Sequence, residues 1–285
     1  IDTSRLRPAG APLKTFGGRA SGPWPFERMF INVGNVFKGA KGRKLTSLEV
    51  HDVMCHIGEC VVVGGVRRTS LISLSNHSDE RMRHAKMGNW FAENPQRSLS
   101  NNSICYTEKP DMGAFMREWL AIYESRSGER GIFNRQACKN MLPERRDSDH
   151  EFGCNPCSEI VLRPGQFCNL TEVVALPSDD IDSLTDKVRL ATILGTLQSC
   201  LTDFKFLRKG WTDNCEEERL LGVSITGIYD CPALRVSSAE MLNDLRDSAR
   251  AVNEKWAKIL EVNPSTAITC IKPSGTVSQL CNSAS

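Results

Sequence analysis

Three side chains that can do chemistry together lie within the segment 155–159, Asn-Pro-Cys-Ser-Glu. In an extended or looped segment, side chains at positions i and i+2 project to the same side, so Asn155, Cys157 and Glu159 are expected to converge on one small ligand. A second thiol, Cys168, follows eleven residues after Cys157. A hydrogen-bonding amide, a thiol and a base at one point suit chemistry on a polyhydroxylated substrate.

Other interpretations of the same segment stay open. Cys154 and Cys157 form a CxxC pair, which is typical of half a zinc site or of a redox dithiol. A structural zinc site needs a second ligand pair, and the sequence contains none. A thioredoxin-like dithiol follows a strand and begins a helix. This pair instead follows the mixed-charge segment 145–150, which is expected to be a solvated loop, and precedes the strand-like segment 160–162. A purely structural loop is the third alternative.

The elements that must position these residues alternate between strand-like and helix-like patterns. Helices are predicted from the capping box Thr46–Glu49 onward, after Asp111, along the apolar stripe of 190–204, and after a second capping box at Ser237–Glu240. Strands are predicted at 61–63, 70–74, 221–225 and 267–271. Strands separated by helices predict an α/β fold with parallel strands.

Bulk properties exclude several classes of protein. The net charge of +2 over 285 residues gives no global electrostatic case for nucleic-acid binding. No apolar run approaches the ~20 residues of a membrane span, and the polar start lacks a signal peptide. Twelve scattered cysteines favour a reducing cytoplasm over a secreted disulfide scaffold. The chain starts at Ile1 and stops at Ser285 without a cap or tail, so we expect an internal fragment of a longer protein.

A second motif, Lys-Pro-Ser-Gly-Thr-Val-Ser-Gln at 272–279, follows a predicted strand and is expected to begin a helix. Free backbone N–H groups at a helix start bind phosphate, and Gly275 permits close approach of the backbone. On its own the motif is more typical of a plain turn with an N-cap.

A third motif, Gly-Gly-Val-Arg-Arg-Thr at 64–69, combines two glycines with two arginines. It predicts a mobile basic loop, and the alternative is a solvated hairpin. The arginine- and glycine-containing segment 9–23 lies upstream of it.

The cysteine segment, Asn-Pro-Cys-x-Glu-Ile followed by Cys-Asn-Leu, resembles the active-site loop of ribonucleotide reductases. The resemblance implies a ten-stranded α/β barrel, incomplete here, with a central finger loop that carries the radical cysteine. It implies Cys157 as the thiyl-radical site, Glu159 as the base on the substrate 3′-hydroxyl and Asn155 as a hydrogen-bonding partner of the ribose hydroxyls. Cys168 would be one of the two cysteines that reduce the 2′-carbon and close into a disulfide.

The other motifs extend the resemblance from about residue 7 to residue 285. The segment 272–279 resembles the family's substrate-phosphate loop, which implies phosphate contacts by Ser274, Gly275, Thr276 and Val277. Two further segments resemble the loops that relay effector identity; their candidate residues are Gly64, Gly65, Val66, Arg67, Arg68, Lys14, Gly17 and Gly18. The style of these loops is most similar to the monomeric adenosylcobalamin-dependent class.

What the resemblance implies is a partial catalytic barrel domain over residues 1–285 of a ribonucleoside-triphosphate reductase for DNA precursor synthesis. Its cofactor would be adenosylcobalamin, with no resident metal and with no cobalamin ligand identified in the sequence. Its partners would be a ribonucleotide substrate, dNTP and ATP effectors and a thioredoxin-type reductant, with neither nucleic acid nor membrane, and a monomer is favoured. The alternatives are the diiron-partner diphosphate reductase large subunit, another radical enzyme on a related barrel such as a glycyl-radical enzyme, and a non-catalytic nucleotide-binding module.

The sequence also departs from the family pattern. The second reducing cysteine is expected on an early strand upstream of residue 9, and no cysteine precedes Cys55. The C-terminal cysteine pair that accepts electrons from thioredoxin is likewise absent. We therefore expect no turnover from the 285-residue chain alone.

Overall fold

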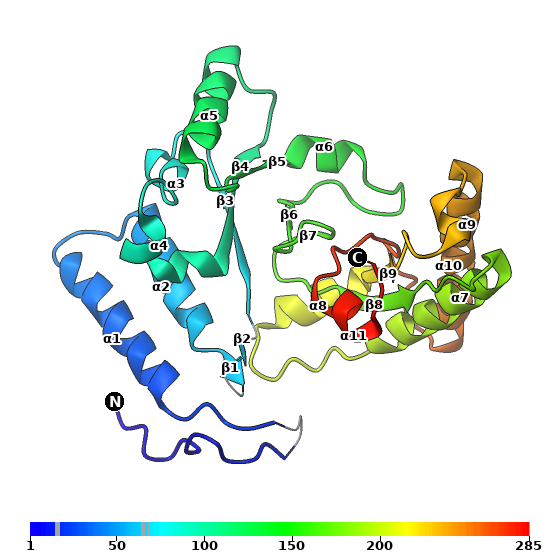
Figure 1. The fold of residues 1–285 in the computed structure, drawn as a ribbon, viewed down its shortest axis with the longest axis horizontal. Helices are drawn as coiled ribbons and strands as arrows, with labels where there is room; N and C mark the ends of the chain where they lie inside the picture. The colour runs from blue at the N-terminus through cyan, green and yellow to red at the C-terminus, as the bar shows by residue number, and fades with distance from the viewer. Residues whose placement is uncertain (15–17, 64–65, 68, 285) are drawn as a thin grey trace. The chain divides into compact units, whose positions relative to one another are not determined.

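The computed structural model describes residues 1–14, 18–63, 66–67 and 69–284. The chain forms two compact units, Ile1–Gln136 and Ala137–Ser285, and each is described by itself. Figure 1 shows the elements of both. The first unit contains α1 (Trp24–Gly39), α2 (Ser47–Glu59), β1 (Val62–Val63), β2 (Val66–Arg67), β3 (Leu71–Ser75), α3 (Glu80–Arg83), α4 (Trp90–Glu93), η1 (Pro95–Leu99), β4 (Ser100–Tyr106), α5 (Met112–Ser125) and β5 (Gly131–Asn134); α6 (Arg135–Asn140) spans the boundary in sequence.

Helix starts in the first unit follow the sequence signals. Thr46 accepts a hydrogen bond from the backbone N–H of Glu49, whose carboxylate accepts one from the Thr46 N–H, so the predicted capping box is confirmed. Asp111 caps α5 through the N–H of Ala114, as predicted. These caps satisfy backbone donors that have no partner inside the helix.

The sheet of the first unit is parallel, in the order β3–β4–β5. Leu71 pairs with Ser100, and Ser103 pairs with Gly131. A buried ion-pair network supports the sheet, because Glu118 of α5 pairs with both Arg83 and Arg130. Parallel strands linked through helices confirm the predicted α/β class in this unit.

The second unit contains β6 (Gly153–Cys154), β7 (Val161–Leu162), β8 (Asn169–Val174), α7 (Ile181–Gln198), α8 (Lys209–Glu218), β9 (Leu221–Thr226), α9 (Pro232–Arg235), α10 (Ala239–Ile259) and α11 (Thr276–Cys281). The strands β6 and β7 form an antiparallel hairpin, and β8 runs parallel to β9 in the register Asn169↔Leu221 to Val174↔Thr226.

The prediction of a strand at 267–271 is wrong, because this segment forms no regular strand. It joins β9 through one parallel bridge, Val223↔Thr269. The Leu221 N–H donates to the Ala267 carbonyl, and the Val223 N–H, two residues later, donates to the very next carbonyl, that of Ile268. Two residues of β9 thus oppose one residue of its neighbour, and this bulge interrupts the ladder.

The core of the second unit lies between these strands and the helices α7 and α10, and its buried members are Val173, Ala175, Leu184, Val188, Ala191, Leu221, Val223, Cys231, Leu234, Leu245, Ala249 and Ile268. The leucine stripe predicted for 190–204 is a helix only as far as Gln198, and it does not face this core. Leu194 is 61% exposed, whereas the small residue Gly195 faces the sheet. A Cβ at Gly195 would stand 2.5 Å from the Leu221 side chain, so close packing selects the small residues for the inner face.

The long C-terminal helix α10 begins one residue later than the capping box predicted at Ser237–Glu240. Ser238 is the N-cap, and its hydroxyl accepts a hydrogen bond from the N–H of Met241. Its buried face includes Leu245, Ala249 and Asn253. Asn253 is fully buried and donates to the hydroxyls of Thr196 and Ser265, which ties α10 to α7.

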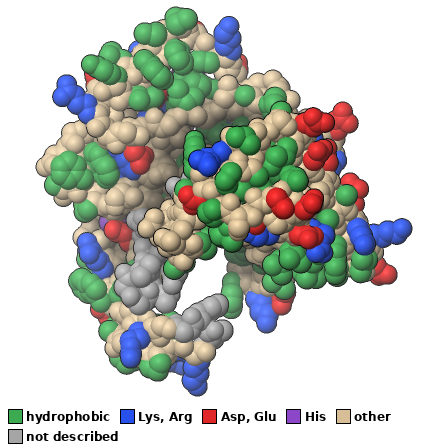
Figure 2. Space-filling view, turned by 45° about the vertical axis from the view of Figure 1, so that its right-hand side comes forward, with side chains coloured by type: hydrophobic (Ala, Val, Ile, Leu, Met, Phe, Trp, Pro, Cys, Tyr) green, Lys and Arg blue, Asp and Glu red, His purple; other side chains and the backbone are tan. Residues whose placement is uncertain are grey.

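Apolar side chains also lie on the molecular surface. Figure 2 shows hydrophobic side chains gathered over α5, at the top of the view. They include Met112, Met116, Trp119 and Tyr123, which recur at helical spacing along the outer face of α5. In the part of the chain that the structure describes, no helix has both the length and the apolar character needed to cross a membrane.

Candidate active site

Cys157 lies at the tip of the β6–β7 hairpin, in a six-residue connection, 155–160. The tip is closed at its base by two hydrogen bonds between the same residues. The Asn155 N–H donates to the Ile160 carbonyl at 3.2 Å, and the Ile160 N–H donates to the Asn155 side-chain Oδ1 at 3.0 Å. The Cys157 side chain is exposed. The hairpin therefore presents the thiol on a loop whose shape is set locally.

The three polar residues of the tip differ in their exposure. Residues 155–158 form a turn closed by the Ser158 N–H on the Asn155 carbonyl at 2.9 Å, with Ser158 in the left-handed region at φ 64°. The alternation of an extended chain is broken there, so Cys157 is exposed whereas the Glu159 side chain is 1% exposed. The Asn155 side-chain oxygen Oδ1 already accepts the Ile160 N–H within the loop. The expected convergence of Asn155, Cys157 and Glu159 on one ligand is therefore only partial.

Glu159 is paired with a lysine that the sequence interpretation left without a role. The Lys272 Nζ donates to Glu159 Oε1 at 2.7 Å, and these residues are 113 positions apart. Burial opposes ionisation of Glu159, but hydrogen bonds from Lys272, from Asn155 and from the backbone, together with the lysine's charge, outweigh it, so the pKa of Glu159 lies below its ordinary value. Among the described residues, Glu159 Oε2 is buried without a hydrogen-bond partner. An ionised, buried carboxylate with one unused oxygen is suited to accept a proton or hydrogen bond from a ligand.

Cys168 and Cys270 are protonated thiols in the same region. Burial, to which the charge of the neighbouring Glu159 carboxylate adds, raises the pKa of each to about 12. The Cys270 Sγ lies 3.1 Å from where a Cβ of Gly222 would stand, on the face of β9 that also meets Leu170 and Ile160. Among the described residues, no cysteine forms a disulfide.

The base of the hairpin is anchored by Arg146, which lies in the charged segment 145–150 that we expected to be a solvated loop. That expectation is wrong for Arg146, which is 5% exposed. Its guanidinium donates to both carboxylate oxygens of Glu218 at 3.0 Å and to the carbonyl of Val161 at 2.9 Å. A run of charged residues does not reveal which member is buried. The partner of Arg146, Glu218, is distant in the sequence and could not be identified from it.

The segment predicted to hold phosphate begins at Lys272, whose backbone N–H donates to the Ser224 hydroxyl at 2.9 Å. Ser274 is 9% exposed, and its hydroxyl accepts the N–H of Ser278 at 3.0 Å. Gly275, Thr276 and Val277 are exposed. The predicted turn and the start of helix α11 are confirmed, whereas the phosphate contacts stay a prediction.

A cavity of about 440 Å³ lies beside the carboxylate and is lined by Ala137, Cys138, Met141, Leu142, Pro143, Arg146, Glu159, Ile160, Val161, Leu220, Leu221, Ala267 and Thr269. Neither Cys157 nor the segment 274–277 is among its lining residues. Glu159 therefore borders a cavity on one side and Lys272 on the other. In the described part of the chain, no three His, Cys, Asp or Glu side chains are grouped so as to hold a metal ion.

The two predicted effector segments meet in the first unit. The Ser21 hydroxyl donates to the Val62 carbonyl at 3.1 Å, which joins segment 9–23 to β1. Lys14 is exposed and Gly18 has φ 77°, as a tight turn requires. Val66 and Arg67 form β2 and pair with β1. Gly17, Gly64, Gly65 and Arg68 lie outside the described residues.

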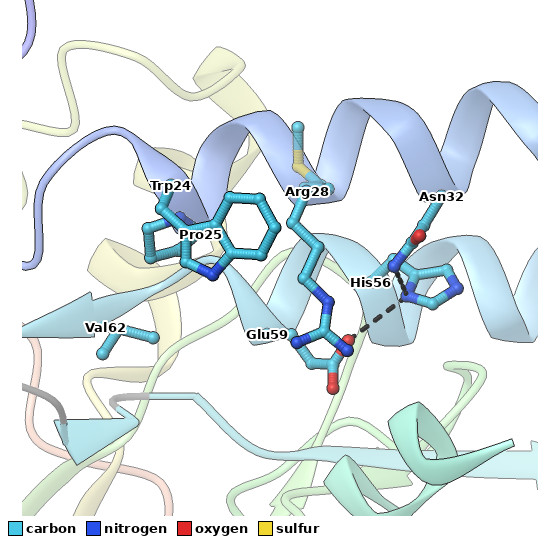
Figure 3. A pocket seen from close by; sticks show the side chains of 8 residues that line it. Trp24, Pro25, Arg28, Asn32, His56, Glu59 and Val62 are labelled. Carbon is cyan, nitrogen blue, oxygen red and sulfur yellow. Dashed lines mark hydrogen bonds and ion pairs between the residues drawn. The ribbon is translucent and has the colours of Figure 1, made fainter.

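A pocket of about 270 Å³ lies at this junction, between α1 and α2, with Val62 at one end. Figure 3 shows the Arg28 guanidinium next to Glu59, with the Trp24 indole on one side of Arg28 and His56 on the other. The His56 Nδ1 lies 3.2 Å from Glu59 Oε2 and 3.4 Å from the Asn32 side-chain nitrogen. An aromatic ring, an arginine and polar side chains give this pocket both a stacking surface and hydrogen-bonding groups.

Comparison with known proteins bears on the chain as a whole. No protein-family model matches it. The adenosylcobalamin-dependent ribonucleoside-triphosphate reductase of Lactobacillus acidophilus is 30% identical over 318 aligned positions, covering 98% of this chain and 41% of the relative. The enzyme of the same name from Lactobacillus leichmannii is 27% identical with the same coverage. The chain thus spans about two fifths of the length of these curated relatives.

Solved structures agree with the sequence comparison. A crystal structure of a B12-dependent (class II) ribonucleotide reductase matches with a TM-score of 0.77 and 26% identity, over 99% of this chain and 42% of that one. The class Id alpha subunit of Actinobacillus ureae matches with a TM-score of 0.58 at 13% identity, which is a likeness of fold alone. The resemblance to the class II ribonucleotide reductase catalytic subunit that the motifs predicted is confirmed.

Proposed function

We propose that this chain carries the thiol-radical site of an adenosylcobalamin-dependent ribonucleotide reductase, which converts ribonucleoside triphosphates to 2′-deoxyribonucleoside triphosphates for DNA precursor synthesis. The observation that carries the proposal is the similarity of nearly the whole chain to class II enzymes, together with the buried, ionised Glu159 two residues from the exposed Cys157. Residues 1–285 would form part of the ten-stranded barrel, with the hairpin 153–162 as its finger.

Each residue has a separate task in this reaction. The Cys157 thiyl takes the hydrogen atom from the substrate 3′-carbon, since a thiol S–H bond is weak enough to exchange with a sugar C–H bond. Glu159 accepts the 3′-hydroxyl proton while the 2′-hydroxyl leaves as water. Cys168 and a second reducing thiol supply the two electrons and the two protons for loss of water and formation of the 2′ C–H bond, and they close into a disulfide. Asn155 would bind the ribose hydroxyls once its loop contact opens.

The cofactor fits the accessible side of the site. Adenosylcobalamin, when bound, supplies the radical that takes the hydrogen atom from the thiol. An exposed Cys157 is compatible with such an approach, because the hairpin tip leaves its side chain open to solvent. No side chain of the described residues is identified as a cobalamin ligand.

The remaining partners follow from the same proposal. Phosphates would bind Ser274 and Thr276 through their hydroxyls and Gly275 and Val277 through their N–H groups. A dNTP or ATP effector would bind at the segments joined by Ser21 and Val62, beside the pocket of Figure 3. We also infer a cytoplasmic monomer with a thioredoxin-type reductant. The diiron-partner class is the runner-up; the class Id alpha subunit of Actinobacillus ureae shares the fold alone.

The experiment compares Cys157→Ser with Cys154→Ser in the full-length protein, using a ribonucleoside triphosphate, adenosylcobalamin and a dithiol reductant. Cys157→Ser is expected to abolish deoxynucleotide formation and 3′-hydrogen exchange while it retains nucleotide binding. Cys154→Ser is expected to keep turnover, because this neighbouring thiol has no role in the reaction. Turnover that survives Cys157→Ser contradicts the thiyl mechanism, and a wild-type protein that only binds nucleotide is a binding module.

A further inference from the structure

Lys272 stands among two carboxylates and three thiols of the second unit. Its Nζ contacts Glu159, and its own pKa, which burial alone would lower, is raised by Glu159 and further by Cys157 and Cys270. The second carboxylate, Glu172, belongs to β8, where it pairs in register with Ser224 of β9. Because Ser224 also holds the backbone of Lys272, the two carboxylates and the lysine belong to one connected cluster.

The two carboxylates have different surroundings. Glu159 has an ammonium group at 2.7 Å. Among the described residues, Glu172 Oε1 is buried without a hydrogen-bond partner, and no ion pair to Glu172 is formed. Burial raises the pKa of Glu172, and the nearby Glu159 carboxylate adds to that rise, whereas Ser224 and Lys272 oppose it. A single cation thus serves one of two neighbouring acids.

Other charged groups near the cluster do not change this assignment. Arg146 is committed to Glu218 through both carboxylate oxygens. Cys168 and Cys270, with their raised pKa values, are uncharged at neutral pH. Lys272 is therefore the cation available to Glu159 and Glu172 within this group of residues.

We propose that Lys272 is a positioning residue that makes Glu159 the base of the site and leaves Glu172 as the acid that retains its proton. Environments that separate two neighbouring carboxyl groups mark one as base and the other as acid. Lys272 is also the first residue of the predicted phosphate segment, so it couples that segment to the base. This inference rests on the proposed function in assigning Glu159 a catalytic task, but the protonation states can be measured without turnover.

The first test is isotope-edited infrared spectroscopy of the full-length protein with 13C-labelled glutamate. Subtracting the spectrum of Glu159→Gln or Glu172→Gln isolates the band of each carboxyl group. At about pH 4.3, the ordinary glutamate pKa, we expect Glu159 to be mostly ionised and Glu172 mostly protonated. In Lys272→Met, the Glu159 band is expected to become that of the protonated acid; in Lys272→Arg it is expected to stay ionised.

The second test uses the pH dependence of kcat/KM with a ribonucleoside triphosphate. Lys272→Met is expected to raise the pKa of Glu159 and so to move the acid limb of the profile to higher pH by at least about one unit. At pH values below the limb this is about a tenfold loss of kcat/KM. Activity is expected to return at alkaline pH, and Lys272→Arg is expected to keep the wild-type limb. Lys255→Met, at an exposed lysine of α10, is the matched control and is expected to change neither readout.

The outcomes separate the two proposals. An ionised Glu159 in Lys272→Met, or an equal loss of activity at every pH, overturns the role of Lys272. A wild-type protein without ribonucleotide turnover overturns the proposed function, while the infrared bands still decide the assignment of base and acid. If Lys272→Met fails to fold, Lys272→Gln replaces it. A wild-type Glu172 that is mostly ionised at about pH 4.3 overturns the proposal by itself.

Discussion

Arg146 and Glu218 form a two-point ion pair inside the second unit, with side chains 2% and 3% exposed. The pair joins the segment before the hairpin to the last turn of α8, 72 residues later. The same guanidinium holds the Val161 carbonyl, and it lies over the Phe152 ring at 4.9 Å. The base of the hairpin that carries Cys157 is therefore fixed by one arginine.

Removing one member of this pair leaves a buried charge without compensation. Arg146→Met is expected to lower the free energy of unfolding by about 3–5 kcal/mol, whereas the double variant Arg146→Met/Glu218→Gln is expected to recover part of that loss. Urea denaturation measures both. Arg189→Met, from an exposed ion pair, is the control and is expected to cost less than about 1 kcal/mol. A loss of that small size in Arg146→Met would contradict the anchoring role.

Gly222 lies where the hairpin and β8 approach β9 most closely. A Cβ there would stand 2.5 Å from the Leu170 side chain and 3.1 Å from both Ile160 and the Cys270 sulfur. Gly222→Ala is expected to destabilise the protein by about 1–3 kcal/mol through overpacking. Gly210→Ala, where a Cβ meets nothing within 4 Å, is the matched control and is expected to be neutral or slightly stabilising. Thermal unfolding of the two variants separates these expectations.

The thiols are expected to react with iodoacetamide in a defined order. Cys157 and Cys281 are exposed, whereas Cys168 and Cys270 are partly buried with pKa values raised to about 12. Because the thiolate is the nucleophile, Cys168 and Cys270 are expected to react at least about tenfold more slowly at pH 8. Peptide mass spectrometry over time measures each rate. Modification of Cys168 as fast as Cys281 would contradict the buried placement.

The Asp52–Arg97 pair of the first unit predicts a loss of stability in acid. Burial opposes ionisation of Asp52, but the Arg97 guanidinium at 2.7 Å outweighs it, so the pKa of Asp52 lies well below its ordinary value. Its contribution is present above the unfolded pKa of about 3.9 and is lost as pH falls through the lower folded pKa.

Asp52→Asn is expected to cost about 2 kcal/mol at pH 7 and to flatten the fall in stability below about pH 4. Denaturant unfolding at a series of pH values measures this. Asp186→Asn, from an exposed pair, provides the reference. If Asp52→Asn loses stability in acid as steeply as the wild type, Asp52 is not the responsible group.

Local signals in the sequence predicted the elements that depend on neighbouring residues. The capping box at Thr46, the cap at Asp111 and the strand 221–225 were predicted correctly, because hydrogen bonds and alternation within a few residues specify them. Apolar periodicity predicted the helix α7 but the wrong buried face. Leucines such as Leu194 point outward, since the close approach of Leu221 admits only small side chains.

The candidate site divides in the same way. Cys157 and Glu159 were found from their motif, whereas the lysine that pairs with Glu159 was recognised only in the structure. Its signal was weak: Lys272 precedes a predicted loop and follows a predicted strand, which fixes a place along the chain but no partner. The burial of Arg146 was not predicted, because the other five residues of segment 145–150 are polar or charged and the whole segment therefore resembles a solvated loop.

Hydrogen bonds between Asn155 and Ile160 close the hairpin tip. As a result, the distance from thiol to carboxylate and the distance from carboxylate to ammonium have different physical origins. The spacing between the thiol and the carboxylate is set within six residues and belongs to the tip itself. The spacing between the carboxylate and the ammonium is set by the tertiary fold, since 113 positions separate them. The tip sequence could therefore be transferred to another protein with this spacing intact. The ammonium group that pairs with Glu159 would have to be supplied by the fold of that protein.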